Sequence, residues 1–275
     1  FYYGKVVTDR STAILACTLY VFVPSVTLVT LHTDQVIYPF LFTTSIAVSA
    51  MAVKRNNLLL AVCTGILIYV SVWFTFALVF TLPFVLVSCY FLSVRHGNSS
   101  PWRSFLAIST AIACGVLLTD VMFRLFFNYD FLLRYENAIG YHTAWKGWTF
   151  TLMETIYFAL LNLIEYCMWI GIPLFLLFVS STLESVAEYR FMKGKLTLES
   201  VQPVVLFATL LLIALVGKTK GEAARLWLFL VPYVCLVLPQ TIMASFKRLL
   251  PWFVVVVVVL QFGTTYLTKV YQDFW

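Results

Sequence analysis

The stretch that decides the fold is residues 58–94, LLLAVCTGILIYVSVWFTFALVFTLPFVLVSCYFLSV, in which 37 consecutive positions carry no charged side chain. A helix that crosses the hydrocarbon core of a bilayer needs about 20 apolar residues. The stretch is therefore too long for one crossing and fits two helices joined by a tight turn. We place the turn near residues 73–75, because aromatic side chains gather there. Basic residues bound the stretch on both sides, at Lys54, Arg55 and Arg95.

The composition of the whole chain is that of a membrane protein. Hydrophobic residues make up 62% of the 275 residues, charged residues make up 11%, and the mean hydropathy is +0.94. A soluble domain carries about 25% charged residues. The net charge of +6 does not indicate nucleic acid as a partner, because the cations lie in short clusters beside apolar runs. The six cysteines are scattered without CxxC spacing, so they indicate small buried hydrophobes.

Outward from residues 58–94, the apolar runs predict an all-α bundle of about nine transmembrane spans. Each span satisfies its own backbone hydrogen bonds as a helix. Basic clusters join alternate spans and are expected on the cytoplasmic side, so the remaining polar loops face outward. The seven other spans are expected at about residues 11–31, 36–53, 104–123, 162–183, 201–216, 226–244 and 251–267.

Two stretches do not fit simple spans. Residues 127–148 are polar but rich in aromatic side chains, which predicts an amphipathic segment lying in the membrane interface. Residues 149–183 are apolar but interrupted by Glu154, Asn162 and Glu165, so their first half is expected to be interfacial or re-entrant. The two glutamates are three helical turns apart and share one face of a continuous helix. They form either a satisfied internal network or a functional group, because carboxylates inside a membrane are costly.

The densest group of charges lies between two apolar runs, in Gly217-KTKGEAARL-Trp227. It contains Lys218, Lys220, Glu222 and Arg225. Outer loops are normally poor in Lys and Arg, so three cations there predict an anionic partner. A guanidinium beside lysines and glycine amides suits a phosphate at headgroup level, and Glu222 is expected to orient Arg225. The alternative is an ordinary loop between two helices.

Further polar residues are expected on the outer side. We expect His142 and Lys146 to contact the same ligand as the cation-rich stretch. Asp34 either caps the N-terminus of the second span or takes part in the activity of the protein. Asp120 and Arg124 are four residues apart, which predicts an ion pair at a helix end. The sequence leaves open whether the protein uses a divalent metal as a cofactor, because no set of ligands with fixed spacing indicates one.

Two motifs resemble the membrane-embedded glycosyltransferases of the GT-C superfamily, which take a sugar from a polyprenyl-phosphate carrier. The sequence GEAARLWLFLVP, residues 221–232, is similar to a late outer-loop-to-helix motif in members of that superfamily. Pro24, followed by HTDQ at 32–35, Tyr38-Pro39 and a long apolar run, is similar to their mid-chain outer loop and returning helix.

The resemblance implies roles for specific residues. A carboxylate, for which Asp34 and Glu154 are the candidates, would act as general base on an acceptor hydroxyl. Arg225, Lys218 and Lys220 would neutralise the departing phosphate. Members of the superfamily usually carry a paired acidic motif in the first outer loop, whereas here that loop offers one aspartate. We therefore expect residues 1–275 to form one transmembrane domain, the C-terminal two thirds of such an architecture.

The expected function is sugar transfer from a polyprenyl-phosphate carrier to an acceptor on the extracytoplasmic or lumenal face. The expected partners are that lipid, membrane lipids and a further subunit, with no nucleic acid. Two alternatives stay open. One is a transporter or flippase for an anionic lipid, which would predict internal repeats. The other is a non-catalytic subunit of a membrane assembly. The sequence predicts an integral multi-pass protein without deciding between plasma membrane and endomembranes.

Overall fold

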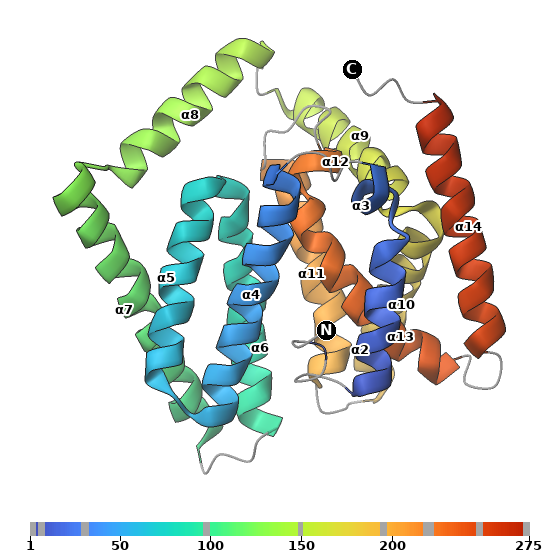
Figure 1. Cartoon of the computed structure of the whole chain (residues 1–275), viewed down its shortest axis with the longest axis horizontal. Helices are drawn as coiled ribbons and strands as arrows, with labels where there is room; N and C mark the ends of the chain where they lie inside the picture. The colour runs from blue at the N-terminus through green and yellow to red at the C-terminus, as the bar shows by residue number, and fades with distance from the viewer. Residues whose placement is uncertain are drawn as a thin grey trace.

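The computed structural model describes residue 4 and residues 9–28, 33–95, 100–147, 151–192, 197–216, 223–245 and 250–271. Every regular element in these ranges is helical, which confirms the all-α prediction (Figure 1). In chain order the elements are α2 (Arg10–Val21), α3 (Pro24–Leu28), α4 (Thr33–Arg55), α5 (Leu58–Phe74), η1 (Phe76–Phe80), α6 (Thr81–Arg95), α7 (Pro101–Phe127), α8 (Phe131–Lys146), α9 (Leu152–Ile170), α10 (Ile172–Met192), α11 (Leu198–Val216), α12 (Ala223–Leu226), η2 (Leu228–Leu230), α13 (Val231–Ser245) and α14 (Leu250–Tyr271).

Within the described ranges, six helices are long and apolar enough to cross a membrane by length and composition. They make the chain a multi-pass membrane protein by that criterion. The nine predicted spans are not all reproduced as helices of spanning length. The six are Val36–Arg55, Phe76–Arg95, Pro101–Phe127, Ile172–Tyr189, Leu198–Val216 and Leu250–Tyr271.

Three predicted spans correspond to shorter apolar helices. The prediction of one span at 11–31 is wrong, because α2 ends at Val21 and Pro24 opens a separate five-residue helix. A proline suits the first turn of a helix and disfavours the helical conformation in the residue before it, which agrees with the break before Pro24. The helix α5 has 17 residues. The span expected at 226–244 begins with the short elements α12 and η2 before the 15 residues of α13.

The prediction of one span at 162–183 is also wrong, because the helix breaks at Gly171. This glycine has a φ of +95°, a conformation that other residues adopt at a cost. From α14, the buried Gln261 side chain donates a hydrogen bond to the carbonyl of Ile170. A Cβ on Gly171 would collide with Gln261. Pro173 then lies in the first turn of α10, where its missing N–H is not needed.

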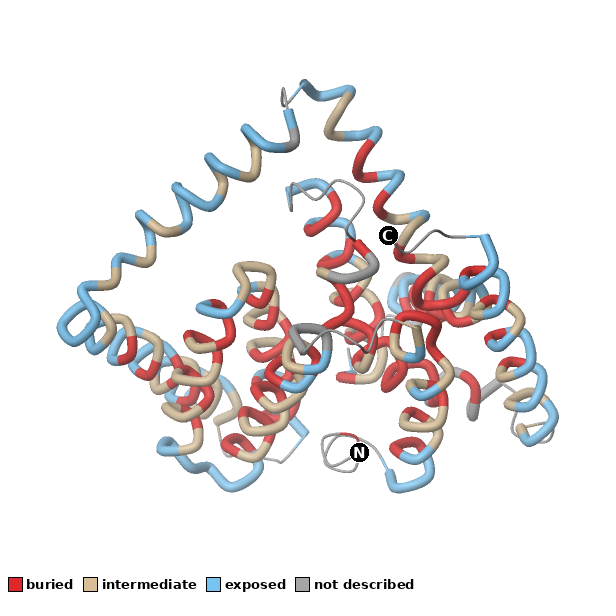
Figure 2. Tube along the Cα trace, turned by 45° about the horizontal axis from the view of Figure 1, so that its top comes forward, coloured by how far each residue is buried: buried red, intermediate tan, exposed pale blue. Residues whose placement is uncertain are grey.

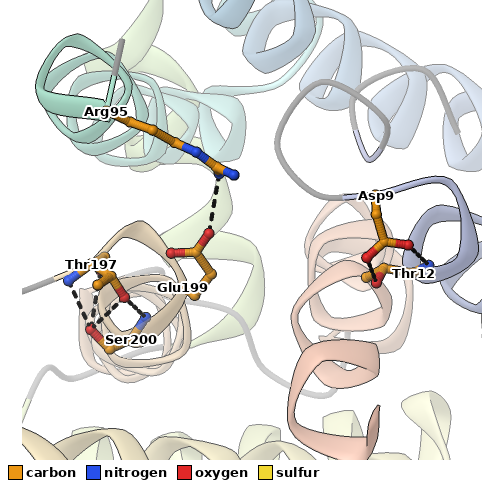
Figure 3. A network of polar contacts seen from close by, with 6 residues as sticks. All are labelled: Asp9, Thr12, Arg95, Thr197, Glu199 and Ser200. Atoms are coloured by element: carbon orange, nitrogen blue, oxygen red, sulfur yellow. Dashed lines mark hydrogen bonds and ion pairs between the residues drawn. The ribbon is translucent and has the colours of Figure 1, made fainter. Parts of the chain in front are cut away.

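The basic helix ends lie together, as the charge pattern predicts. α4 and α6 end, and α5 and α7 begin, at the lower end of the bundle (Figure 1). At the end of α6, Arg95 pairs with Glu199 in the first turn of α11 at 3.2 Å (Figure 3). Both side chains are about half exposed, so the pair contributes little to stability. We call the opposite end of the bundle, where α5 and α11 finish, the outer end.

Aromatic packing in the middle of the bundle joins helices that are distant in the sequence. The Phe42 ring of α4 is fully buried. Its centroid lies 5.4 Å from the ring centroid of Phe84 in α6, 5.3 Å from that of Phe229 in η2 and 6.1 Å from that of Tyr233 in α13. These edge-to-face contacts connect the two halves of the chain. Buried residues concentrate in the middle of the bundle, while α8 forms an exposed arm (Figure 2).

The helices α5 and α7 cross closely. A Cβ on Gly65 would collide with the backbone carbonyl of Ile112, and a Cβ on Gly115 would collide with that of Val62. Small residues let helix backbones approach in this way in membranes, where van der Waals packing drives association.

We therefore expect Gly65→Ala to destabilise the protein by about 1–3 kcal/mol, the usual cost of overpacking. The matched control is Gly263→Ala in α14, where a Cβ would meet nothing within 4 Å. Thermal unfolding in detergent, followed by loss of the monodisperse species, measures both variants. Equal melting temperatures for the two would contradict the close crossing.

Candidate functional site

A cavity of about 460 Å³ opens at the outer end between the turn after α5, helix α8 and the ends of α11 and α12. Its wall is mainly apolar and aromatic, with a few polar groups from Thr75, Tyr135 and His142. This is the usual make-up of a small-molecule site. The lining residues are Thr75, Phe76, Ala77, Val79, Phe80, Tyr135, Ala138, Ile139, His142, Ile213, Val216, Leu226 and Trp227.

The first wall is the turn that the sequence predicts near residues 73–75, and the structure confirms it. The helix α5 ends at Phe74, and Thr75 takes an extended conformation with a φ of −152°. The chain then makes the 3₁₀ turn η1, which brings Phe76 and Phe80 to the cavity. The apolar run of residues 58–94 is thus divided at this wall.

The second wall is α8, the segment predicted to lie in the membrane interface. Asn128 ends α7 in the left-handed conformation with a φ of +49°. Asp130 then caps α8, accepting hydrogen bonds from the N–H groups of Leu132 at 2.9 Å and Leu133 at 3.1 Å. The hydrogen bonds from the N–H groups of Leu133 and Leu132 hold the pKa of Asp130 below its usual range. The cap therefore contributes to α8 stability at neutral pH and is lost only as the pH falls through the lowered pKa.

Two of the predicted ligand contacts lie on α8. His142 is half-buried, lines the cavity and has its ring 6.5 Å from that of Trp145. Lys146 is the last residue of α8, and its side chain lies outside the described part of the structure. The described residues contain no group of three or more His, Cys, Asp or Glu side chains that could hold a metal ion.

Described residues on both sides of the predicted cations line the cavity. Lys218, Lys220 and Glu222 lie outside the described residues, and Arg225 lies in α12 with a side chain that is not described. Val216 directly precedes the cation-rich stretch and Leu226 directly follows Arg225 within it, and both line the cavity. The chain therefore leaves the cavity wall just before the predicted phosphate-binding residues and returns to it just after them.

The predicted set of Glu154, Asn162 and Glu165 lies on one continuous helix, α9. Glu165 accepts a hydrogen bond from the N–H of Ala223 at 3.2 Å and so ties α9 to the first residue of α12. Asn162 is fully buried. Glu154 lies in the first turn of α9, where Thr151 Oγ1 accepts the Glu154 N–H at 3.3 Å. This spacing is that of a capping box, and Glu154 does not line the cavity.

The two remaining predictions have different outcomes. Asp34 lies in the first turn of α4, and its side chain is outside the described part of the chain. The predicted pair of Asp120 and Arg124 is confirmed, with Nε of Arg124 2.8 Å from the carboxylate. A third partner was not predicted: the Tyr69 hydroxyl donates to the same carboxylate at 2.9 Å. Asp120 is therefore engaged in holding α5 against α7.

Sequence reasoning did not identify the aromatic wall of the cavity. Phe76, Phe80 and Tyr135 line it together with Trp227, which is fully buried and lies 5.9 Å from the ring of Tyr166. The available signal was the accumulation of aromatic residues on both sides of the turn at 73–75 and within residues 127–148. Their convergence depends on how α8 folds back, which no local pattern encodes.

We expect Glu165→Ala to loosen α12, because the N–H of Ala223 loses a charged acceptor. A hydrogen bond to a charged group contributes about 1.5–3 kcal/mol, and partial exposure of Glu165 reduces this. Amide hydrogen exchange over residues 223–226 should therefore accelerate about tenfold. Glu165→Gln retains a neutral acceptor oxygen and should give an intermediate acceleration. Glu154→Ala lies elsewhere on α9 and should leave this exchange nearly unchanged. An unchanged amide exchange rate over residues 223–226 in Glu165→Ala would refute the hydrogen bond between Ala223 and Glu165.

Comparison of the chain with models of protein families, with curated proteins and with solved structures gives no match. The function of the protein must therefore be inferred from its residues, from the cavity at the outer end and from the two motifs described above.

Proposed function

We propose that the protein is a membrane glycosyltransferase that moves a sugar from a polyprenyl-phosphate carrier to an acceptor at the outer end of the bundle. The observation that carries the proposal is the lining of one cavity by His142, by Val216 just before the cation-rich stretch and by Leu226 just after Arg225. Such a cavity can bring a bound headgroup near Lys218, Lys220 and Arg225.

The cations supply the charge that this chemistry requires. When the bond from the anomeric carbon to the carrier phosphate breaks, the phosphate leaves with the electron pair and gains negative charge. Cations placed at the leaving group stabilise this charge more in the transition state than in the ground state. Arg225 is suited to the role because a guanidinium binds two phosphate oxygens at once.

A lipid carrier also requires an apolar groove, and one lies beside the cavity. A groove of about 530 Å³ is lined by residues of α2, α4, η2 and α13, with Tyr20, Phe40 and Tyr233 among them. Trp227 lines the cavity and the next residue, Leu228, lines the groove. One short segment therefore separates the two spaces, an arrangement that supports a ligand with a polar head and an isoprenoid tail.

The proposed reaction needs a general base. A carboxylate would take the proton of the acceptor hydroxyl while the oxygen of that hydroxyl forms a bond to the anomeric carbon. None of the residues described in the cavity wall is a carboxylate. The base is therefore proposed to be Asp34 or Glu154, approaching when the acceptor is bound.

The same observation favours a second candidate function, a subunit that binds a lipid phosphate and leaves the chemistry to a partner. A wall without a carboxylate among its described residues suits binding as well as transfer. The two candidates differ in one respect. The first requires turnover by the purified chain, and the second requires binding alone.

The test uses the purified protein in lipid nanodiscs with a polyprenyl-phosphate sugar. We expect Arg225→Ala to reduce transfer at least about 100-fold, the effect of removing one charge-stabilising group. The control is Arg103→Ala, an exposed arginine in the first turn of α7 at the opposite end. Full turnover by a folded Arg225→Ala variant would refute the proposed role. Binding without turnover in the unmodified protein would favour the second candidate.

A cavity-filling variant tests where the lipid binds. Ala138 is exposed on α8 and lines the cavity, so Ala138→Trp should fill much of it and weaken binding of a polyprenyl phosphate at least tenfold. Ala144 is exposed on the same helix and does not line the cavity, so Ala144→Trp is the matched control. Binding is measured by microscale thermophoresis in nanodiscs. Equal affinities for the two variants would place the headgroup elsewhere.

A further inference from the structure

The helix α8 lacks the buried face that normally holds a helix in place. None of residues 131–145 is buried, and large side chains such as Tyr141 and Trp145 are 80% and 74% exposed. The helix stands apart from the bundle as an arm that joins α7 to α9 (Figures 1 and 2). Most helical stability in proteins comes from packing of one face, and 16 residues are marginal alone. The position of α8 therefore depends on a few specific contacts.

Among the described residues, several such contacts involve Arg134, in the first turn of α8. The Arg134 guanidinium donates through Nη1 to the carbonyl of Trp73 and to the hydroxyl of Tyr129, both at 2.6 Å. It also lies over three rings, 5.1 Å from that of Phe76, 5.7 Å from Tyr129 and 5.8 Å from Trp73. The carbonyl of Trp73 belongs to the last turn of α5, which carries partial negative charge. One side chain thus fastens α8 to the end of α5.

Two aromatic neighbours pack at the same place. Phe131 and Tyr135 lie 5.6 Å and 5.2 Å from the ring of Phe76. Phe131 also lies 6.1 Å from Tyr69 of α5. Together with Arg134 they form what we call the α8 anchor, defined by Phe131, Arg134 and Tyr135.

The other half of α8 carries the cavity wall. Ala138, Ile139 and His142 line the cavity opposite η1 and the end of α11. His142 lies eight residues beyond Arg134, which is about 12 Å along a helix. A rotation of about 10° at the anchor would therefore move His142 by about 2 Å. Small changes at Arg134 translate into changes in cavity width.

We infer that Arg134 is a positioning residue for the outer cavity: through its contacts with Trp73, Tyr129 and Phe76 it sets the distance of the α8 wall from the bundle. The guanidinium acts through α8 and is not among the residues that line the cavity. Arg is the residue that suits this task, because its planar group donates two bonds and stacks on rings at once, whereas a lysine ammonium does not. This inference goes beyond the proposed function and does not require the transfer reaction.

The experiment measures the distance from α8 to the bundle by pulsed electron paramagnetic resonance in nanodiscs. Genetically encoded spin labels at Tyr141 of α8 and Leu215 of α11, 80% and 52% exposed, avoid the native cysteines. Without a further substitution, the labelled protein should give one narrow distribution of the distance between the two labels. Arg134→Ala should widen that distribution at least twofold, and Arg134→Lys should give an intermediate width. Glu136→Ala, which changes an exposed charge on the same helix, is the matched control.

Two further readouts separate positioning from general stability. The melting temperature of Arg134→Ala should stay within a few degrees of the unmodified protein, while the Kd for a polyprenyl phosphate rises about tenfold. If Arg134→Ala does not fold, Tyr129→Phe removes one acceptor and should still widen the distribution. An unchanged distribution in the folded variants, or equal widening in Glu136→Ala, would overturn the inference. A widened distribution in Arg134→Ala together with no transfer by the unmodified protein would support the inference and count against the proposed function alone.

Discussion

The structure depends on one constraint, the need to satisfy backbone N–H and C=O groups in apolar surroundings. With no water to bind them, these groups must pair within helices, and every place where a helix stops must supply other partners. The described breaks show how this is met. The carbonyl of Ile170 receives a hydrogen bond from Gln261 of a distant helix, and the N–H of Thr75 bonds back to Ser71 at the end of α5. The outer cavity forms at one of these breaks.

Partly buried charges follow the same rule within the described part of the chain. Asp120 is held by Tyr69 and Arg124, Glu165 by the N–H of Ala223, and Arg134 by two oxygens and three rings. Each group also connects two elements. Charges in a low-dielectric region are expensive without partners, so they are placed where they join helices.

Much of the helical architecture follows from the sequence, because apolar runs and basic clusters act over short distances. The uncharged run at 58–94 predicts the division at Thr75, and the four-residue spacing of Asp120 and Arg124 predicts their pair. The break at Gly171 could not be predicted in the same way, because it needs Gln261 from 90 residues later in the chain to satisfy the freed carbonyl. A local pattern does not contain such a partner.

The site is less predictable than the fold for a related reason. His142 could be singled out as a polar residue near the outer end, but its neighbours in the cavity come from η1, α11 and α12, which meet only in three dimensions. The decisive element is α8. None of its residues 131–145 is buried against the bundle, so the amphipathic pattern expected for residues 127–148 gives no direction in which the helix docks.

That weakness of α8 is consistent with the demands of a lipid ligand. A polar headgroup attached to a long apolar tail enters a site from the side, along the membrane, and a wall packed into the bundle would block the path. A wall that the contacts of Arg134 hold to α5 can move without disturbing the edge-to-face contacts of Phe42, because those contacts join α4 to α6, η2 and α13. The polar and aromatic contacts of Arg134 give the wall a defined resting position, while the exposed remainder of the helix keeps the cost of moving it low.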